Sequence, residues 1–127
     1  VSAEMVRAAS RRHQTRANVR FVHAATPGEP ADYGMASGIL NVRFSRPDDE
    51  WAGYIERVLE VLDRTSTRGF AFNCLTSYSD PDRMRSDLYY ADPCALFDLC
   101  KRRYSPHVAL LHDYGLYEFT ILVRKRQ

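Results

Sequence analysis

The sequence predicts an α/β domain with a mostly parallel sheet, of which the chain holds only the later part. Strand-like and helix-like stretches alternate along most of the 127 residues, as they do where helices join parallel strands. The chain nevertheless opens on a helix pattern with no strand before it. A crossover helix needs a strand that leads into it. We therefore interpret residues 1–127 as one truncated domain of a larger parent.

Composition and charge argue against several classes of protein. The chain is 45% hydrophobic and 27% charged, which is typical of a globular domain. The formal net charge of +2 is too small to indicate nucleic-acid binding. No apolar run is long enough to span a membrane, and no signal peptide is recognisable. The three cysteines lack the paired spacing of a zinc site, so we expect no metal and a cytoplasmic protein with reduced thiols.

The first third of the chain predicts one helix and two strands. The helix is expected over residues 3–13, with Ser2 as its N-cap. Alternating residues predict a short strand over 19–22, and a Pro- and Gly-rich loop follows over 26–30. The second strand is expected over 33–38. Several arginines and a single glutamate make the opening stretch basic, which is typical of a solvated helix face.

The middle of the chain predicts the strongest helix and a central strand. Apolar residues recur at helical spacing over 51–62, and the acidic residues 48–50 suit the positive end of this helix. Ser45 or Asp48 is the expected N-cap. Residues 69–75 are almost continuously apolar, which indicates a strand covered on both faces.

The last third predicts a long loop, a helix and a strand pair. The polar loop over 76–91 is rich in tyrosine, and Asp92 and Pro93 suit the N-cap and first position of a helix. Two strands follow, over 107–111 and 116–123. They are joined by only a few residues, so they must be antiparallel.

Candidate site residues follow the ends of the parallel strands, where open α/β sheets bind ligands. Ser37, Gly38 and Asn41 follow the second expected strand, and Asn73 lies near the end of the third. Gly38 permits a sharp turn or a close approach, and the other three offer hydroxyl and amide groups. An equally supported alternative is that these side chains only satisfy backbone groups at strand ends.

Two further pairs have weaker claims to function. Tyr89 and Tyr90 either wall a substrate site or tuck the loop onto the sheet, and we slightly favour the second. His112 and Asp113 resemble an acid/base pair. The turn that holds them is expected on the far side of the sheet, which argues against catalysis. The chain has no GxSxG, HExxH or GxxxxGK motif.

Four stretches resemble the class I S-adenosylmethionine-dependent methyltransferases. They are DYGMASGILNVR at 32–43, RGFAFN at 68–73, DLYYADP at 87–93 and YEFTI at 117–121. More narrowly, they look like a group of small bacterial enzymes with similar "SGI-N-R", "RG-AFN" and "LYYADP" stretches. The likeness covers nearly the whole chain, and the order of the motifs is more specific than any one of them.

The resemblance implies a Rossmann-like sheet of seven strands in the order 3-2-1-4-5-7-6, with the last strand antiparallel. This chain would supply strands 3 to 7 and lack strands 1 and 2. In the family, those two strands carry a glycine-rich loop and an acidic residue that hold S-adenosylmethionine. The family often has a further acid after strand 3, where this chain reads His23 and Ala24.

The resemblance also suggests which residues would surround the ligands. One group would line the remaining cofactor site: Ser37, Gly38, His23 and Ala24. A second group would face the acceptor: Asn41, Asn73, Tyr89 and Tyr90. No catalytic residue is named, because the sulfonium supplies much of the chemistry and the protein mainly aligns the reactants.

The implied function is methyl transfer to a small-molecule acceptor by the intact parent. We expect this chain alone to be inactive and to bind S-adenosylmethionine weakly or not at all. One alternative is a non-catalytic binding or assembly module, and another is a different α/β enzyme that uses His112 and Asp113. Loss of strands 1 and 2 would bare the edge of strand 4, and bare edges recruit partners. Either strand 3 would move to pair there, or two chains would form a homodimer through that edge.

Overall fold

The computed structural model describes residues 2–125 as an α/β fold with a mixed, open sheet. The elements follow one another as α1 (Ala3–Arg12), β1 (Ala31–Ala36), α2 (Asp48–Thr65), β2 (Ser66–Thr76), η1 (Pro81–Arg83), β3 (Tyr90–Ala91), α3 (Pro93–Arg103), β4 (His107–Leu111) and β5 (Glu118–Arg124). Except for the segment at 19–22, the expected elements appear with their ends shifted by at most a few residues.

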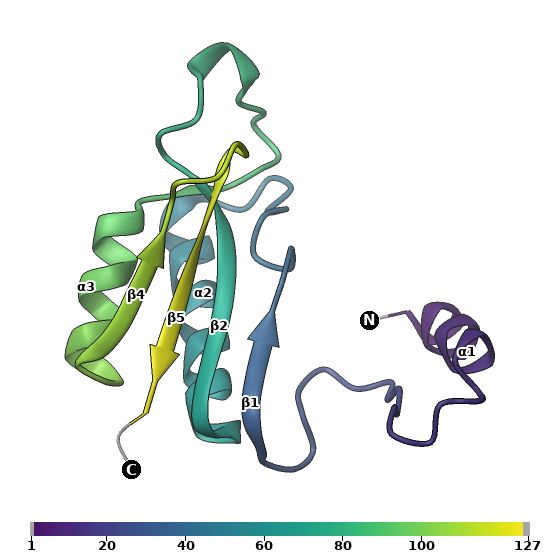
Figure 1. Ribbon diagram of the computed structural model, residues 1–127. Coiled ribbons are helices and arrows are strands. Elements are labelled where there is room, and N and C mark those ends of the chain that lie inside the picture. Colours follow the sequence, from purple (N-terminus) through teal and green to yellow (C-terminus); the bar gives the residue numbers. More distant parts are fainter. Residues whose placement is uncertain (1, 126–127) are drawn as a thin grey trace.

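The strands lie in the order β1-β2-β5-β4, and the short β3 pairs with the end of β2 (Figure 1). β1 and β2 are parallel, whereas β5 is antiparallel to both β2 and β4. The predicted antiparallel arrangement of the final strand pair is therefore confirmed. It follows that β4 runs in the same direction as β1 and β2, so all three strands end at one edge of the sheet.

The helices α2 and α3 lie on the same face of the sheet (Figure 1). α2 packs on β1 and β2, and α3 packs on β4 and β5. Alternate residues of β2 and β5 point toward the helices, so Phe72, Phe119 and Ile121 are fully buried there. The opposite face carries Tyr33 and Met35, which are strongly exposed.

The stripe predicted for α2 is confirmed, but its predicted cap is wrong. Four residues of the stripe are buried: Trp51, Ile55, Leu59 and Leu62. The N-cap position belongs to Pro47, whose side chain makes no capping bond. Ser45 lies too early, and Asp48 is already the first helical residue, where its carboxylate forms an ion pair with Arg43. The indole Nε1 of Trp51 donates to the Leu40 oxygen at 2.9 Å and so ties the loop after β1 to this helix.

The predicted start of α3 is confirmed. Pro93 is its first residue, and the Asp92 side chain accepts hydrogen bonds from the amides of Cys94 and Ala95 at 2.9 and 3.3 Å. These bonds satisfy two of the amides that every helix start leaves unpaired.

The strand predicted over 19–22 is wrong. This segment has no regular secondary structure; it pairs with no strand of the described chain and lies apart from the sheet with α1 (Figure 1). Its Phe21 ring stacks on His13 at a centroid distance of 5.6 Å. An alternating pattern forms a strand only where a neighbour accepts its backbone hydrogen bonds. The outer edge of β1 is likewise unpaired within residues 2–125, so the expected movement of the segment to that edge does not occur.

Candidate functional site

Three loops converge at the carboxyl edge of the sheet. They follow β1, β2 and β4, and they cover residues 37–47, 77–89 and 112–117 (Figure 1). The parallel direction of the three strands brings these loops to one edge. Most of the residues singled out from the sequence lie in these loops or at the strand ends below them.

Asn73 joins the end of β2 to the turn after β1. Its Oδ1 accepts from the Gly38 amide at 2.8 Å, and its Nδ2 donates to the Ser37 Oγ at 3.1 Å. Both ends of the amide are engaged, so Asn73 positions the turn. The Ser37 hydroxyl keeps a proton to donate. Gly38 adopts φ +74°, and a Cβ placed on it would meet open space, so the backbone itself is accessible to a ligand.

Asn41 makes a second connection between the loops. Its Oδ1 accepts from the Leu75 amide at 3.2 Å, and its backbone oxygen accepts from the Tyr89 amide at 2.8 Å. The Arg43 guanidinium lies 5.8 Å from the centre of the half-buried Tyr89 ring. Burial raises the pKa of the Tyr89 phenol, so this group stays protonated at neutral pH.

Tyr90 stabilises the loop in which it lies. Its hydroxyl accepts from the Arg85 amide at 2.8 Å, and its backbone belongs to β3. Tyr89 and Tyr90 are both half-buried, and together with Asn41 they hold the long loop against the sheet. These contacts pack the loop on the sheet, and the substrate contacts predicted for Tyr89 and Tyr90 stay predictions.

His23 and Ala24 are not brought to this edge. They lie in the segment between α1 and β1, which approaches β1 from the amino end (Figure 1). Ala24 lines a separate small hollow whose walls come from residues 20–29. The predicted cofactor contacts of His23 and Ala24 therefore stay predictions.

The placement of His112 on the far side of the sheet is wrong. Because β4 runs parallel to β2, the turn after it stands at the carboxyl edge, where His112 Nε2 lies 2.8 Å from Thr76 Oγ1. Thr76 is 1% exposed and already accepts from the Tyr78 amide at 3.2 Å. The hydrogen bond ties the turn after β4 to the end of β2.

Sequence reasoning missed this His112–Thr76 contact, although a signal for it was present. A strand that follows a crossover helix runs parallel to the strand before that helix. Applied to β2, α3 and β4, this rule places the turn after β4 at the same edge as Asn73.

Comparison with known proteins identifies the family. The chain is 67% identical over 125 residues to "Putative methyltransferase Rv1506c" of Mycobacterium tuberculosis (strain ATCC 25618 / H37Rv). The match covers 98% of this chain and 75% of that protein. The chain belongs to this methyltransferase family. No family model and no solved structure matches it.

Two of the three cysteines of this methyltransferase-family chain are poor candidates for covalent chemistry. Cys74 and Cys100 are buried, and burial raises the pKa of each thiol to about 12. They are therefore un-ionised at neutral pH, whereas only the thiolate is a strong nucleophile. Cys94 is exposed, and all three cysteines are free. In residues 2–125, no cluster of three metal-ligating side chains occurs.

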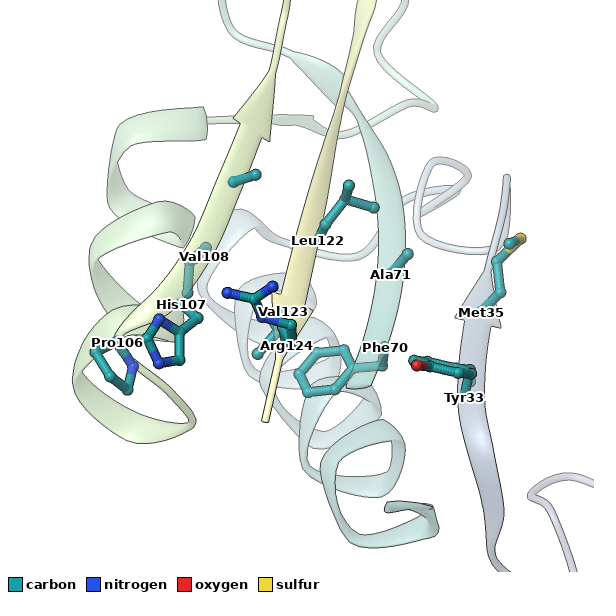
Figure 2. A pocket seen from close by; sticks show the side chains of 12 residues that line it. Tyr33, Met35, Phe70, Ala71, Pro106, His107, Val108, Leu122, Val123 and Arg124 are labelled. Carbon is teal, nitrogen blue, oxygen red and sulfur yellow. The ribbon is translucent and has the colours of Figure 1, made fainter. Parts of the chain in front are cut away.

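A hollow of the methyltransferase-family chain lies away from this edge. It measures about 690 Å³ and opens on the face of the sheet opposite α2 and α3, nearer the amino ends of the strands (Figure 2). The carboxyl edge is the candidate site, because parallel strands present their polar loop residues there. None of the helices described is long and apolar enough to cross a bilayer.

Replacing Asn73 by alanine should release the turn after β1. The variant loses the bonds to Gly38 and Ser37, so we expect the free energy of unfolding to fall by about 1–2 kcal/mol. We also expect faster hydrogen exchange at the Gly38 amide. The matched control is Asn18→Ala, which changes an exposed asparagine far from the site. Equal exchange at Gly38 in both variants would show that Asn73 does not hold the turn.

Proposed function

We propose that this chain forms the acceptor side of an S-adenosylmethionine-dependent methyltransferase, and that alone it binds the cofactor weakly or not at all. The observation that carries the proposal is the Asn73 connection to Ser37 and Gly38 at the carboxyl edge, beside the unpaired edge of β1. The strand order supports it, because β1-β2-β5-β4 with β5 antiparallel corresponds to strands 4-5-7-6 of the resembled sheet.

The residues present fit S-adenosylmethionine on one side only. Gly38 leaves its backbone open to a ligand, and Ser37 offers a hydroxyl beside it. These groups are neutral, and the region across the unpaired edge of β1 carries no described strand. A ligand held at one wall keeps much of its freedom and gains few contacts, so its affinity is low.

The residues of this chain would act by holding the reactants. When bound, the cofactor supplies an activated methyl group, and the protein contributes alignment with the acceptor. Asn73 fixes the Ser37–Gly38 turn, and Asn41 fixes the loop that carries Tyr89. Tyr89 is not a general base at neutral pH, since burial raises the pKa of its phenol. We expect a small-molecule acceptor, because the net charge of +2 is too small to favour nucleic acid.

Titration of S-adenosylmethionine, followed by backbone NMR, tests the proposal. We expect chemical-shift changes at the Ser37 and Gly38 amides that do not saturate below roughly 1 mM cofactor. Such a titration corresponds to a binding free energy no more favourable than about −4 kcal/mol. Asn73→Ala should abolish these shifts, and Asn18→Ala should leave them unchanged. Saturation at micromolar cofactor would contradict the weak-binding half of the proposal. Shifts confined to other parts of the chain would contradict the location of the site.

An assembly module is the second candidate function, favoured by the unpaired edge of β1. Two copies joined through β1 would protect its amides from hydrogen exchange and would form a homodimer. A monomer with unprotected β1 amides would count against it. For both candidates we propose a cytoplasmic location, which the three free cysteines support.

A further inference from the structure

A row of polar side chains crosses the carboxyl end of the sheet, on the face opposite α2 and α3. Asn73 pairs in register with Thr120, and residues in register point to the same face. Asn73 Nδ2 donates to Ser37 Oγ at 3.1 Å, and Thr120 Oγ1 lies 2.8 Å from the Tyr114 hydroxyl. Glu118 lies on the same face of β5, two residues from Thr120 and nearer the edge. We call these five residues the polar row.

Glu118 is the charged member of the polar row. Its side chain is half-buried, yet within residues 2–125 its carboxylate makes no hydrogen bond and no ion pair. Leu75 is its partner in register and offers no polar side-chain group. Partial burial weakens the solvation of a carboxylate, and no cation of the described chain compensates for this loss. Such a group is typical of a binding site whose ligand supplies the missing hydrogen bonds.

The hydroxyl groups of the polar row can both donate and accept hydrogen bonds. The Ser37 hydroxyl accepts from Asn73 and keeps its own proton. Thr120 and Tyr114 share one hydrogen bond, so one of their two hydroxyl protons remains for a ligand. Because β1, β2 and β5 are neighbours, the row spans about 10 Å from Ser37 to Thr120. The row therefore presents several hydroxyl groups with one carboxylate beside them.

This mixture of groups selects a ligand by its charge. A ligand carboxylate or phosphate would meet Glu118 with like charge. An ammonium group would pair with Glu118, but it has no lone pair to accept from Ser37 or Tyr114, and none to receive a methyl group. A neutral hydroxyl meets both requirements, since it donates to the carboxylate and accepts from a neighbouring hydroxyl. Several hydroxyls on one molecule are needed to reach across the row.

We propose that the polar row binds a neutral molecule with several hydroxyl groups, one of which donates a hydrogen bond to Glu118. The inference rests on the proposed function, because it names the class of methyl acceptor that stands beside the Ser37–Gly38 turn. Glu118 is then a specificity-determining residue of the acceptor site. Every residue of the row belongs to this chain, so binding does not require the part of the relative outside the match.

Titration of the 127-residue chain with glucose, a neutral probe with several hydroxyls, tests the proposal by backbone NMR without cofactor. We expect chemical-shift changes at the amides of Ser37, Glu118 and Thr120 that saturate with a dissociation constant of roughly 10 mM. Glu118→Gln should raise this constant about tenfold or more, because it removes a charge-assisted hydrogen bond. Thr120→Val should raise it about fivefold. Glu4→Gln, at an exposed position of α1, is the matched control and should leave it unchanged.

Two charged probes with the same sugar ring test the selection by charge. Glucuronate should bind about tenfold more weakly than glucose, and glucosamine within about threefold of it, because an exposed ion pair adds little. The proposal is overturned if glucose causes no saturable changes up to roughly 100 mM, or if Glu118→Gln and Glu4→Gln bind it equally. Clearly tighter binding of glucosamine would overturn it as well, since the row would then select a cation. No cofactor is used, so failure here is distinguishable from failure of the proposed function.

Discussion

Replacing Phe119 by alanine is expected to lower the free energy of unfolding by about 3–5 kcal/mol. The ring is fully buried in β5, where it pairs in register with Cys74 of β2. It also lies 6.0 Å, centre to centre, from His112. Truncation removes the apolar contacts and leaves a cavity that the two strands cannot close without losing their register. A domain of this size has only about 5–15 kcal/mol to lose.

Urea denaturation followed by circular dichroism measures this change. Leu116→Ala is the matched control, because Leu116 lies in the neighbouring turn and is 63% exposed. We expect the control to change stability by less than about 0.5 kcal/mol. A loss of less than 1 kcal/mol in Phe119→Ala would mean that the core lies elsewhere than between the helices and this face of the sheet.

Replacing Gly69 by alanine is expected to destabilise the sheet by about 1–3 kcal/mol. A Cβ on Gly69 would lie 2.5 Å from the backbone oxygen of Val123 in β5. Backbone cannot move aside as a flexible side chain can, so the hydrogen bonds between β2 and β5 would have to shift. The stability is therefore lost between β2 and β5, which are the two inner strands in the order β1-β2-β5-β4.

Gly53→Ala is the control, and we expect it to raise the stability that Gly69→Ala lowers. Gly53 lies within α2, and a Cβ there would meet only the Arg57 side chain, at 3.5 Å. Alanine is the better helix former by about 1 kcal/mol, so this variant should be more stable than the natural chain. Thermal unfolding of the two variants gives the comparison. Destabilisation by Gly53→Ala, or none by Gly69→Ala, would contradict the packing of these elements.

Local patterns in the sequence predicted most of the elements. The stripe over 51–62 and the Asp92–Pro93 start are properties of single helices, so they required no knowledge of neighbours. The segment at 19–22 has a strand pattern but no partner for its backbone. Its misassignment shows that alternation describes one face of a strand and not the neighbour that stabilises it.

The sequence predicted which residues lie at the candidate site, but it did not predict how they contact one another. Ser37, Gly38 and Asn73 do meet, but the sequence could not show that both ends of the Asn73 amide are engaged across 35 residues of chain. His112 was placed at the wrong edge because its position depends on the order of strands in space. Thr76 contacts His112, but a single threonine at the end of a strand does not indicate such a contact in the sequence.

We propose that this chain carries one wall of a cofactor site and that the part of the mycobacterial relative outside the match supplies the rest. The most direct test is calorimetric titration of S-adenosylmethionine into the 127-residue chain, alone and joined to the unmatched quarter of the mycobacterial relative. We predict no saturable binding below roughly 1 mM for the chain alone, and at least tenfold tighter binding for the joined protein. Micromolar binding by the chain alone, or equal weak binding by both proteins, would contradict the account.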